Sequence, residues 1–236
     1  MLQPSGYPTG EGMLIPADVA IIPLSYAEPA FSTLSSCNGP AKRIFDIVGS
    51  LILLALCLVP MLLIALAISC DSPGPILFRQ RRIGYANIGF TALKFRTMRH
   101  VPGVRGALRQ ATRDDRRVTR VGGFLRRWSL DELPQLCNVL RGDMSLVGPR
   151  PHAPGTCAGG KPFEMVTPRY HARHRVRPGM TGLAQIRGLR GETETEEKLL
   201  RRVAADLEYI EKWSFRLDLT ILARTAISVA CTRNAY

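Results

Sequence analysis

The sequence has little of what cysteine-rich, zinc-binding and nucleic-acid-binding proteins use. Its cysteines are scattered without a CxxC pair, which argues against a disulfide framework or a zinc site and favours a reducing cytosolic setting. They are Cys37, Cys57, Cys70, Cys137, Cys157 and Cys231. Aromatic residues make up only 7% of the chain, and it contains no helix-turn-helix, zinc-finger or RNA-binding signature. We therefore expect no nucleic-acid partner.

The first forty residues lack hydrophobic periodicity and are rich in proline, glycine and serine. A secretory signal would need a basic stretch followed directly by an apolar core, and that combination is missing here. We therefore predict an irregular leader over residues 1–40 instead of a folded domain.

Acidic residues are scarce, because 19 Asp and Glu stand against 32 Lys and Arg, for a formal net charge of +13. Residues 79–127 hold fourteen of the basic residues against only Asp114 and Asp115. This excess indicates an anionic partner, either nucleic acid, anionic lipid or a phosphorylated substrate. For any single arginine, a solvated loop or a face resting on lipid headgroups is an equally good explanation. Since 46% of the residues are hydrophobic, charge and apolar surface must be segregated, as in membrane-associated proteins.

The one long apolar run covers residues 47–69, and its 23 uncharged residues are long enough to cross a bilayer as a helix. Pro60, near the middle, removes a backbone hydrogen bond and predicts a kink. Basic residues flank both ends, with Lys42 and Arg43 before the run and three arginines at 79–82 after it, so the positive-inside rule favours neither orientation. We predict a re-entrant helix that enters and leaves by the same face. A straight crossing is the next alternative, and a buried soluble helix is the least favoured.

The length and patterning predict one main domain of the α/β class, mostly helical. We divide the chain into the leader, a re-entrant membrane helix hairpin (41–70) and a small cytosolic domain at the membrane surface (71–236). Short strand-like runs at 76–78 and 88–95 predict a β-hairpin. Residues 152–191 are mostly irregular, with His171 and His174 expected at the surface or facing phosphate.

Two helices are predicted after this irregular region. Residues 196–213 have apolar positions at helical spacing with charges between them, which is typical of an amphipathic helix. Residues 213–231 are more apolar but too charged to span a bilayer. They fit a helix lying at the membrane interface, and an ordinary core helix is equally compatible.

Adjacent carboxylates, Asp131 and Glu132, lie in the stretch SLDELPQL (129–136). Ser129 with Glu132 fits a capping box and Pro134 fits a first helical turn, so a purely structural explanation exists. Arginines at 126, 127, 141 and 150 and an aspartate at 143 surround the pair in sequence. Arginine binds phosphate bidentately, a helix N-terminus attracts phosphate, and a carboxylate can hold Mg²⁺ or act as a nucleophile. The spacing favours a phosphate-handling site without naming its reaction.

Seven motifs, in this order, resemble the bacterial sugar transferase family, the monotopic polyprenyl-phosphate phosphoglycosyl transferases. They are KRIFD (42–46), DSPGP (71–75), KFRTM (94–98), SLDELPQL (129–136), GDMSLVGPRP (142–151), RPGMTG (177–182) and WSFRLDL (213–219). The resemblance implies transfer of a sugar 1-phosphate from a UDP-sugar to undecaprenyl phosphate. The products would be undecaprenyl-diphosphate-sugar and UMP, formed through a covalent phosphosugar-aspartate at the start of exopolysaccharide synthesis. The resemblance puts the catalytic domain on the cytosolic face of the bacterial inner membrane, in contact with its lipids, and leaves monomer and homodimer open.

The resemblance also implies roles for individual residues. Asp131 would be the nucleophile that attacks the phosphate bearing the sugar, and Glu132 would help to hold Mg²⁺. The phosphate-binding cations would be Lys94, Arg96, Arg126 and Arg150. Asp206, in the predicted helix before Trp213, matches an acid that the family has near its site.

Two features depart from the family pattern. The family kink is commonly Ser-Pro, whereas Val59 precedes Pro60 here, so the hydroxyl that would help to satisfy a freed carbonyl is missing. The chain also has about forty irregular residues in place of the large N-terminal membrane bundle of longer members. The tract at 190–197 resembles the branch that uses glucose or galactose 1-phosphate, and it is equally well explained as an acidic helix start. The alternative to an enzyme is a catalytically silent, membrane-anchored scaffold.

Overall fold

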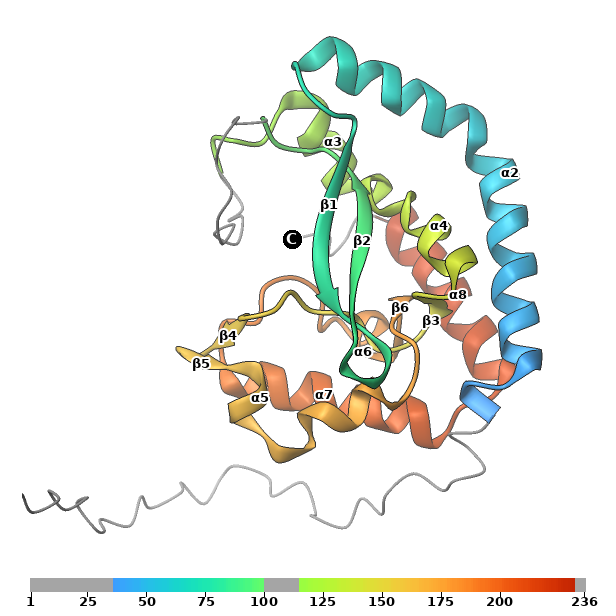
Figure 1. Cartoon of the computed structure of the whole chain (residues 1–236), viewed down its shortest axis with the longest axis vertical. Coiled ribbons are helices and arrows are strands. Elements are labelled where there is room, and N and C mark those ends of the chain that lie inside the picture. Colours follow the sequence, from blue (N-terminus) through green and yellow to red (C-terminus); the bar gives the residue numbers. More distant parts are fainter. Residues whose placement is uncertain (1–35, 100–114, 232–236) are drawn as a thin grey trace, which may run out of the picture.

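The computed structural model describes residues 36–99 and 115–231 (Figure 1). Nearly all of the predicted leader, and residues 100–114 of the basic block, lie outside the described residues. The elements, in chain order, are α2 (Pro40–Asp71), β1 (Leu77–Ile83), η1 (Tyr85–Asn87), β2 (Gly89–Phe95), α3 (Arg120–Arg127), η2 (Leu130–Glu132), α4 (Gln135–Arg141), β3 (Ser145–Val147), β4 (Cys157–Ala158), β5 (Lys161–Pro162), α5 (Phe163–Val166), η3 (Pro168–Arg175), β6 (Gly179–Thr181), α6 (Leu183–Ile186), α7 (Glu196–Glu211) and α8 (Phe215–Ala230). The prediction of a mostly helical fold with small sheets is confirmed.

The predicted hairpin is formed by β1 and β2, which pair antiparallel from Leu77 opposite Phe95 to Ile83 opposite Gly89. It is longer than predicted, because β1 continues through the basic residues that the sequence suggested as the turn. Alternating burial along β1 explains this, since every second side chain faces away from the core and tolerates charge. The hairpin runs through the centre of the molecule in Figure 1, with α3 near one end and α6 near the other.

The apolar run forms α2, a single helix of 32 residues that contains Pro60. It is long and apolar enough to cross a membrane by length and composition. Figure 1 shows α2 bending along the outside of the domain, and an internal proline is the usual physical cause of such a bend. Its middle is exposed, with Leu56 71% and Val59 64% accessible, so the domain leaves this apolar stretch uncovered.

Both ends of α2 are fastened to the same domain. At the start, Lys42 is buried and forms ion pairs with Asp46 at 3.0 Å and with Asp218 of α8 at 2.9 Å. Asp46 also accepts hydrogen bonds from the Ser145 hydroxyl and the Leu146 backbone N–H of β3. At the end, Ile68 is buried in a cluster with side chains of β2 and α3. The exposed middle of α2 is therefore held between two attached ends.

The main core lies between α4, β3, α7 and α8, and Val139, Met144, Ile210 and Ile221 are fully buried there. Next to it, β3 and β6 pair in parallel, with Ser145 opposite Gly179. Gly179 is required at this crossing, because a Cβ there would lie 2.1 Å from the backbone nitrogen of Gly148.

The helices predicted at 196–213 and 213–231 are present as α7 and α8. α7 buries its apolar face, and α8 buries Ile221 and Asp218 while exposing Leu219 and Ile227. The region 152–191, predicted to be mostly irregular, consists of short elements that contact α7 and the hairpin turn. His171 is exposed as predicted, but His174 is buried, and the Nδ1 atoms of both rings lie within hydrogen-bonding distance of the Asn87 side-chain oxygen in that turn.

Candidate active site

The acidic stretch starts with a sharp backbone turn. Ser129 has a φ of 55°, in the left-handed region, and the short helix η2 carries Asp131 and Glu132 directly after it. The capping-box prediction is wrong, because Ser129 makes no side-chain cap and Glu132 turns to cations from other elements. Pro134 stands directly before α4, close to its predicted position. The turn places two consecutive carboxylates beside the hairpin, and Glu132 binds cations there instead of capping a helix.

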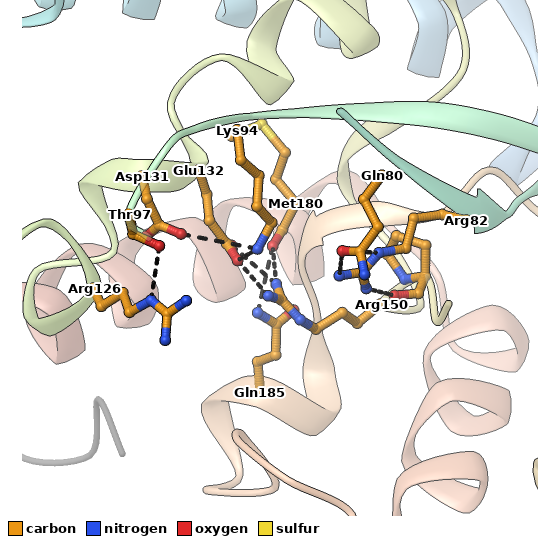
Figure 2. Close-up of polar contacts among 11 residues, drawn as sticks. Gln80, Arg82, Lys94, Thr97, Arg126, Asp131, Glu132, Arg150, Met180 and Gln185 are labelled. Atoms are coloured by element: carbon orange, nitrogen blue, oxygen red, sulfur yellow. Dashed lines mark hydrogen bonds and ion pairs between the residues drawn. The ribbon is translucent and has the colours of Figure 1, made fainter. Parts of the chain in front are cut away.

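Glu132 is held by two cations (Figure 2). Lys94 of β2 donates to its Oε1 at 2.7 Å, and Arg150 donates to its Oε2 at 3.0 Å. The second guanidinium N–H group of Arg150 bonds to Oε1, which completes a bidentate pair. Asp131 has a looser environment, with its Oδ2 3.9 Å from the Lys94 ammonium.

This difference separates the acidities of the two carboxyl groups. The pKa of Asp131 is raised to about 6, mainly by burial. The positive charge of Lys94 opposes this increase, and the negative charge of Glu132 adds to it. Burial also raises the pKa of Glu132, but the charges of Arg150 and Lys94 outweigh it and hold that pKa well below its usual range. At neutral pH both carboxylates are ionised, and Asp131 is the one that cations stabilise less.

Further cations surround the pair. Arg126 of α3 donates from its Nε to the Thr97 hydroxyl at 2.9 Å, which orients its guanidinium group next to Asp131 in Figure 2. Arg82 of β1 donates to the Pro151 carbonyl at 2.7 Å, beside Arg150. Burial and, to a smaller extent, the nearby Arg150 charge lower the pKa of Arg82 to about 10, against the opposing effect of Glu132.

Arg190 belongs to the same electrostatic environment. Burial lowers the pKa of Arg190, as does the Arg150 charge, while Glu132 raises it. Neither Arg82 nor Arg190 is among the predicted site residues. Their proximity to Glu132 follows from tertiary packing, and nothing in the sequence separates them from the other arginines.

The remaining predicted site residues lie apart from the carboxylates. The Arg96 guanidinium donates to the carbonyls of Ser72 at 2.5 Å and Pro73, at the end of α2. Asp206 of α7 is buried and pairs with Arg173 at 2.6 Å. Arg173 in turn donates to the Arg150 carbonyl at 2.7 Å, so Asp206 stands behind Arg150 instead of facing the acidic pair. Pro60 lies in the exposed middle of α2.

The pair has the chemistry that Mg²⁺ requires, because Mg²⁺ binds through one or two carboxylates together with substrate phosphates. Both oxygens of Glu132 are bonded to cations, so Glu132 would have to release one of them to bind a metal. Within residues 36–99 and 115–231, no group of three or more His, Cys, Asp and Glu side chains could hold a metal on its own. The donor set therefore fits a cation that is shared with a phosphate ligand.

A buried carboxylate with a raised pKa, a second carboxylate clamped by cations and an adjoining arginine cluster form the candidate site, and these groups are of the kind that bind phosphate and its counter-ions. The uncovered apolar helix α2 belongs to the same domain. The bacterial sugar transferase family model matches residues 37–232, and the chain belongs to that family. The recognition made from the seven motifs is thus confirmed.

Three relatives illustrate the similarity. The chain is 54% identical over 204 residues to an undecaprenyl-phosphate glucose phosphotransferase of Komagataeibacter xylinus, covering 86% of this chain and 38% of the relative. It is 54% identical over 195 residues to a UDP-glucose:undecaprenyl-phosphate glucose-1-phosphate transferase of Caulobacter vibrioides, covering 83% and 72%. It is 50% identical over 188 residues to an exopolysaccharide production protein of Rhizobium leguminosarum, covering 79% and 94%. The chain therefore spans well under half of the first relative and most of the other two.

Proposed function

We propose that this protein transfers a sugar 1-phosphate, with glucose preferred, from a UDP-sugar to undecaprenyl phosphate, and that this step starts exopolysaccharide synthesis. The observation that carries the proposal is the unequal state of two adjacent carboxylates. Glu132 is clamped by Lys94 and Arg150, whereas Asp131 is buried with a raised pKa. The names of the three relatives support the choice of sugar, acceptor and process.

In the first step, a carboxylate oxygen of Asp131 attacks the phosphorus that bears the sugar. A new P–O bond forms to Asp131, and the bond to the bridging oxygen breaks. UMP leaves with that oxygen and its electron pair, so no proton has to be transferred. A carboxylate that cations stabilise weakly is a better nucleophile than one in a bidentate pair, which favours Asp131 over Glu132 for this role.

In the second step, a phosphate oxygen of undecaprenyl phosphate attacks the same phosphorus. The bond to Asp131 breaks, the carboxylate is regenerated, and the product is undecaprenyl-diphosphate-sugar. Lys94, Arg126 and Arg150 would bind the phosphate oxygens in both steps, because ionised donors in a water-poor site stabilise the charge that accumulates there.

Mg²⁺ is the cofactor that we propose, with Glu132 as its protein ligand and Asp131 beside it. When bound, it would neutralise charge on the phosphate oxygens of the substrate. Glu132 would then exchange Lys94 or Arg150 for the metal. The released cation would remain within reach of the phosphate.

We place α2 in the cytosolic leaflet of the inner membrane as a re-entrant helix. Its two ends are attached to one domain and its middle is apolar and exposed, so a helix that returns to the same face fits both observations. The exposed apolar residues Phe215, Leu219 and Ile227 of α8 support an interfacial position for that helix. The site would then face both a cytosolic nucleotide sugar and a lipid phosphate at the bilayer surface.

The test of the function is UMP release by the purified protein with undecaprenyl phosphate and Mg²⁺. UDP-glucose should be the fastest donor in a panel with UDP-galactose and UDP-N-acetylgalactosamine, and Asp131→Asn should release no UMP. Full activity in Asp131→Asn would exclude Asp131 as the nucleophile. Intact membrane binding without UMP release from any donor would favour the scaffold alternative.

The topology has a separate test. Single cysteines at Ala41→Cys and Asp71→Cys mark the two ends of α2, and both native residues are exposed. In a variant without the native cysteines, an impermeant maleimide should label both from the cytosolic side only. Labelling from opposite sides would show a straight crossing.

A further inference from the structure

Asn138 of α4 carries a polar side chain and is fully buried. Its side chain leaves α4 and meets the backbone of β2. The Oδ1 atom accepts a hydrogen bond from the Leu93 N–H at 2.9 Å, and the Nδ2 group donates to the Thr91 carbonyl at 2.8 Å. A third bond, from Nδ2 to the Asp143 carboxylate at 3.1 Å, fixes the amide from the opposite side.

The two backbone groups that Asn138 binds belong to one edge of β2. In a strand, the N–H and C=O groups of residues i and i+2 point to the same side, and β1 already pairs with the other edge. A carboxamide has the donor and acceptor of a peptide group. Asn138 therefore occupies the place that a neighbouring strand would take, at one position along β2.

That position is next to the cation of the site. Lys94 follows Leu93 directly, and its side chain points to the opposite face, where its ammonium lies 2.7 Å from Glu132 and 3.9 Å from Asp131. Asn138 and Glu132 are joined by a short continuous stretch from η2 into α4. One segment thus carries both carboxylates and Asn138, and the other carries Lys94 and the backbone that Asn138 holds.

We propose that Asn138 is a positioning residue that sets the register of β2 against η2 and α4, so that the Lys94 ammonium lies between the two carboxylates. A slip of one residue along β2 would turn Lys94 to the other face of the hairpin. This role rests on the proposed function, because it assumes that Lys94 acts in the transfer reaction. A purely structural role for Asn138 is the competing explanation.

A double-mutant cycle separates the two explanations. Asn138→Ala should lower kcat for UMP release by about 100-fold, as expected when a site group moves by about 1 Å. In a Lys94→Met background, the same change should lower the residual kcat by no more than about twofold, because the residue through which it acts is gone. An equal fold-loss in both backgrounds would overturn the proposal.

Ser145→Ala is the matched control. It also removes buried hydrogen bonds, to Asp46 at 3.0 Å and to the Val147 carbonyl at 2.9 Å, but these lie on β3 and do not hold β2. Its effect on kcat should be the same with and without Lys94. Asn138→Asp serves if the alanine variant does not fold. It keeps the shape and the acceptor for the Leu93 N–H, but it loses the donor to the Thr91 carbonyl and to the Asp143 carboxylate and brings two carboxylates together. Wild-type kcat in Asn138→Asp would also overturn the proposal.

Amide hydrogen exchange provides a readout that does not depend on catalysis. The Leu93 amide should exchange at least tenfold faster in Asn138→Ala than in the wild type, while amides of β2 that pair with β1 change by less than about twofold. Unchanged exchange at Leu93 would overturn the proposal. If the wild-type protein released no UMP from any donor, the proposed function would fail, and Leu93 exchange would still show whether Asn138 holds β2.

Discussion

Replacing Asp131 by asparagine should abolish transfer and, at neutral pH, make the folded protein more stable. The carboxylate is buried, and Lys94 is its only cationic partner within 4 Å among the described residues. Burial raises the pKa of Asp131 from 3.8 to about 6, so the folded state binds the proton more tightly than the unfolded chain does. The stability that this proton contributes is fully present below pH 3.8 and is lost as the pH rises through 6.

The size of the effect follows from that shift. A difference of about two pKa units corresponds to roughly 3 kcal/mol of unfolding free energy at pH 7.5. We expect about 1–3 kcal/mol to be recovered, because the asparagine must still find hydrogen-bond partners beside Glu132. For a chain of this size, this is an increase in Tm of about 3–10 °C. Asparagine does not ionise, so the gain should shrink towards zero near pH 4.

The assay is thermal unfolding of both proteins in the same detergent at pH 4.5 and pH 7.5. Glu197→Gln, which breaks an exposed ion pair with Arg201, should change the stability by less than about 1 kcal/mol at either pH and serves as the control. A fall in Tm for Asp131→Asn at pH 7.5, or a gain that does not depend on pH, would refute the reasoning. A fall in Tm would mean that the folded state stabilises the buried carboxylate. A gain that is the same at both pH values would mean that folding does not shift the pKa of Asp131.

Three further predictions concern the same elements. Arg150→Lys should lower kcat/KM about 10- to 100-fold, because lysine cannot form the two bonds that Arg150 makes to Glu132. Unchanged kinetics would show that this bidentate pair is not needed for the reaction. In a pH-rate profile, kcat/KM should fall tenfold per pH unit below about pH 6, because protonated Asp131 is not a nucleophile. A flat profile down to pH 5 would contradict the assignment of Asp131 as the nucleophile. Arg96→Met removes the donors to the carbonyls at the end of α2, so it should lower the unfolding free energy by about 1–3 kcal/mol. It should also raise KM for undecaprenyl phosphate more than KM for the UDP-sugar. Equal changes in both KM values would make Arg96 a general structural residue.

Much of the fold could be predicted from local patterns. The apolar run at 47–69 predicted α2, and the short strand-like runs at 76–78 and 88–95 predicted the hairpin. The helical spacing over 196–213 predicted α7, and the more apolar stretch at 213–231 predicted α8. The capping box failed for a physical reason. The motif considers only neighbours in sequence, whereas Glu132 finds stronger partners in Lys94 and Arg150, which are 38 and 18 residues away.

The individual basic residues could not be sorted by sequence. Arg82, Arg96 and Arg126 come from the same basic block but have different partners. Arg82 lies beside Arg150, Arg96 binds carbonyls at the end of α2, and Arg126 bonds to Thr97 next to Asp131. Which arginine meets which group depends on how the hairpin packs against α2 and α3.

Nothing in the sequence around Asn138 predicted the role that we propose for it. That role depends on hydrogen bonds to the edge of β2, at a residue 45 positions away in the sequence.

The most direct test of the central claim is a single-turnover reaction with UDP-glucose and Mg²⁺ but without undecaprenyl phosphate. The protein should release about one equivalent of UMP and gain the mass of a hexose phosphate. Peptide mass spectrometry should locate that group on Asp131, and it should disappear when undecaprenyl phosphate is added. UMP release only in the presence of the lipid, or a hexose phosphate located on any other residue, would contradict Asp131 as the covalent nucleophile.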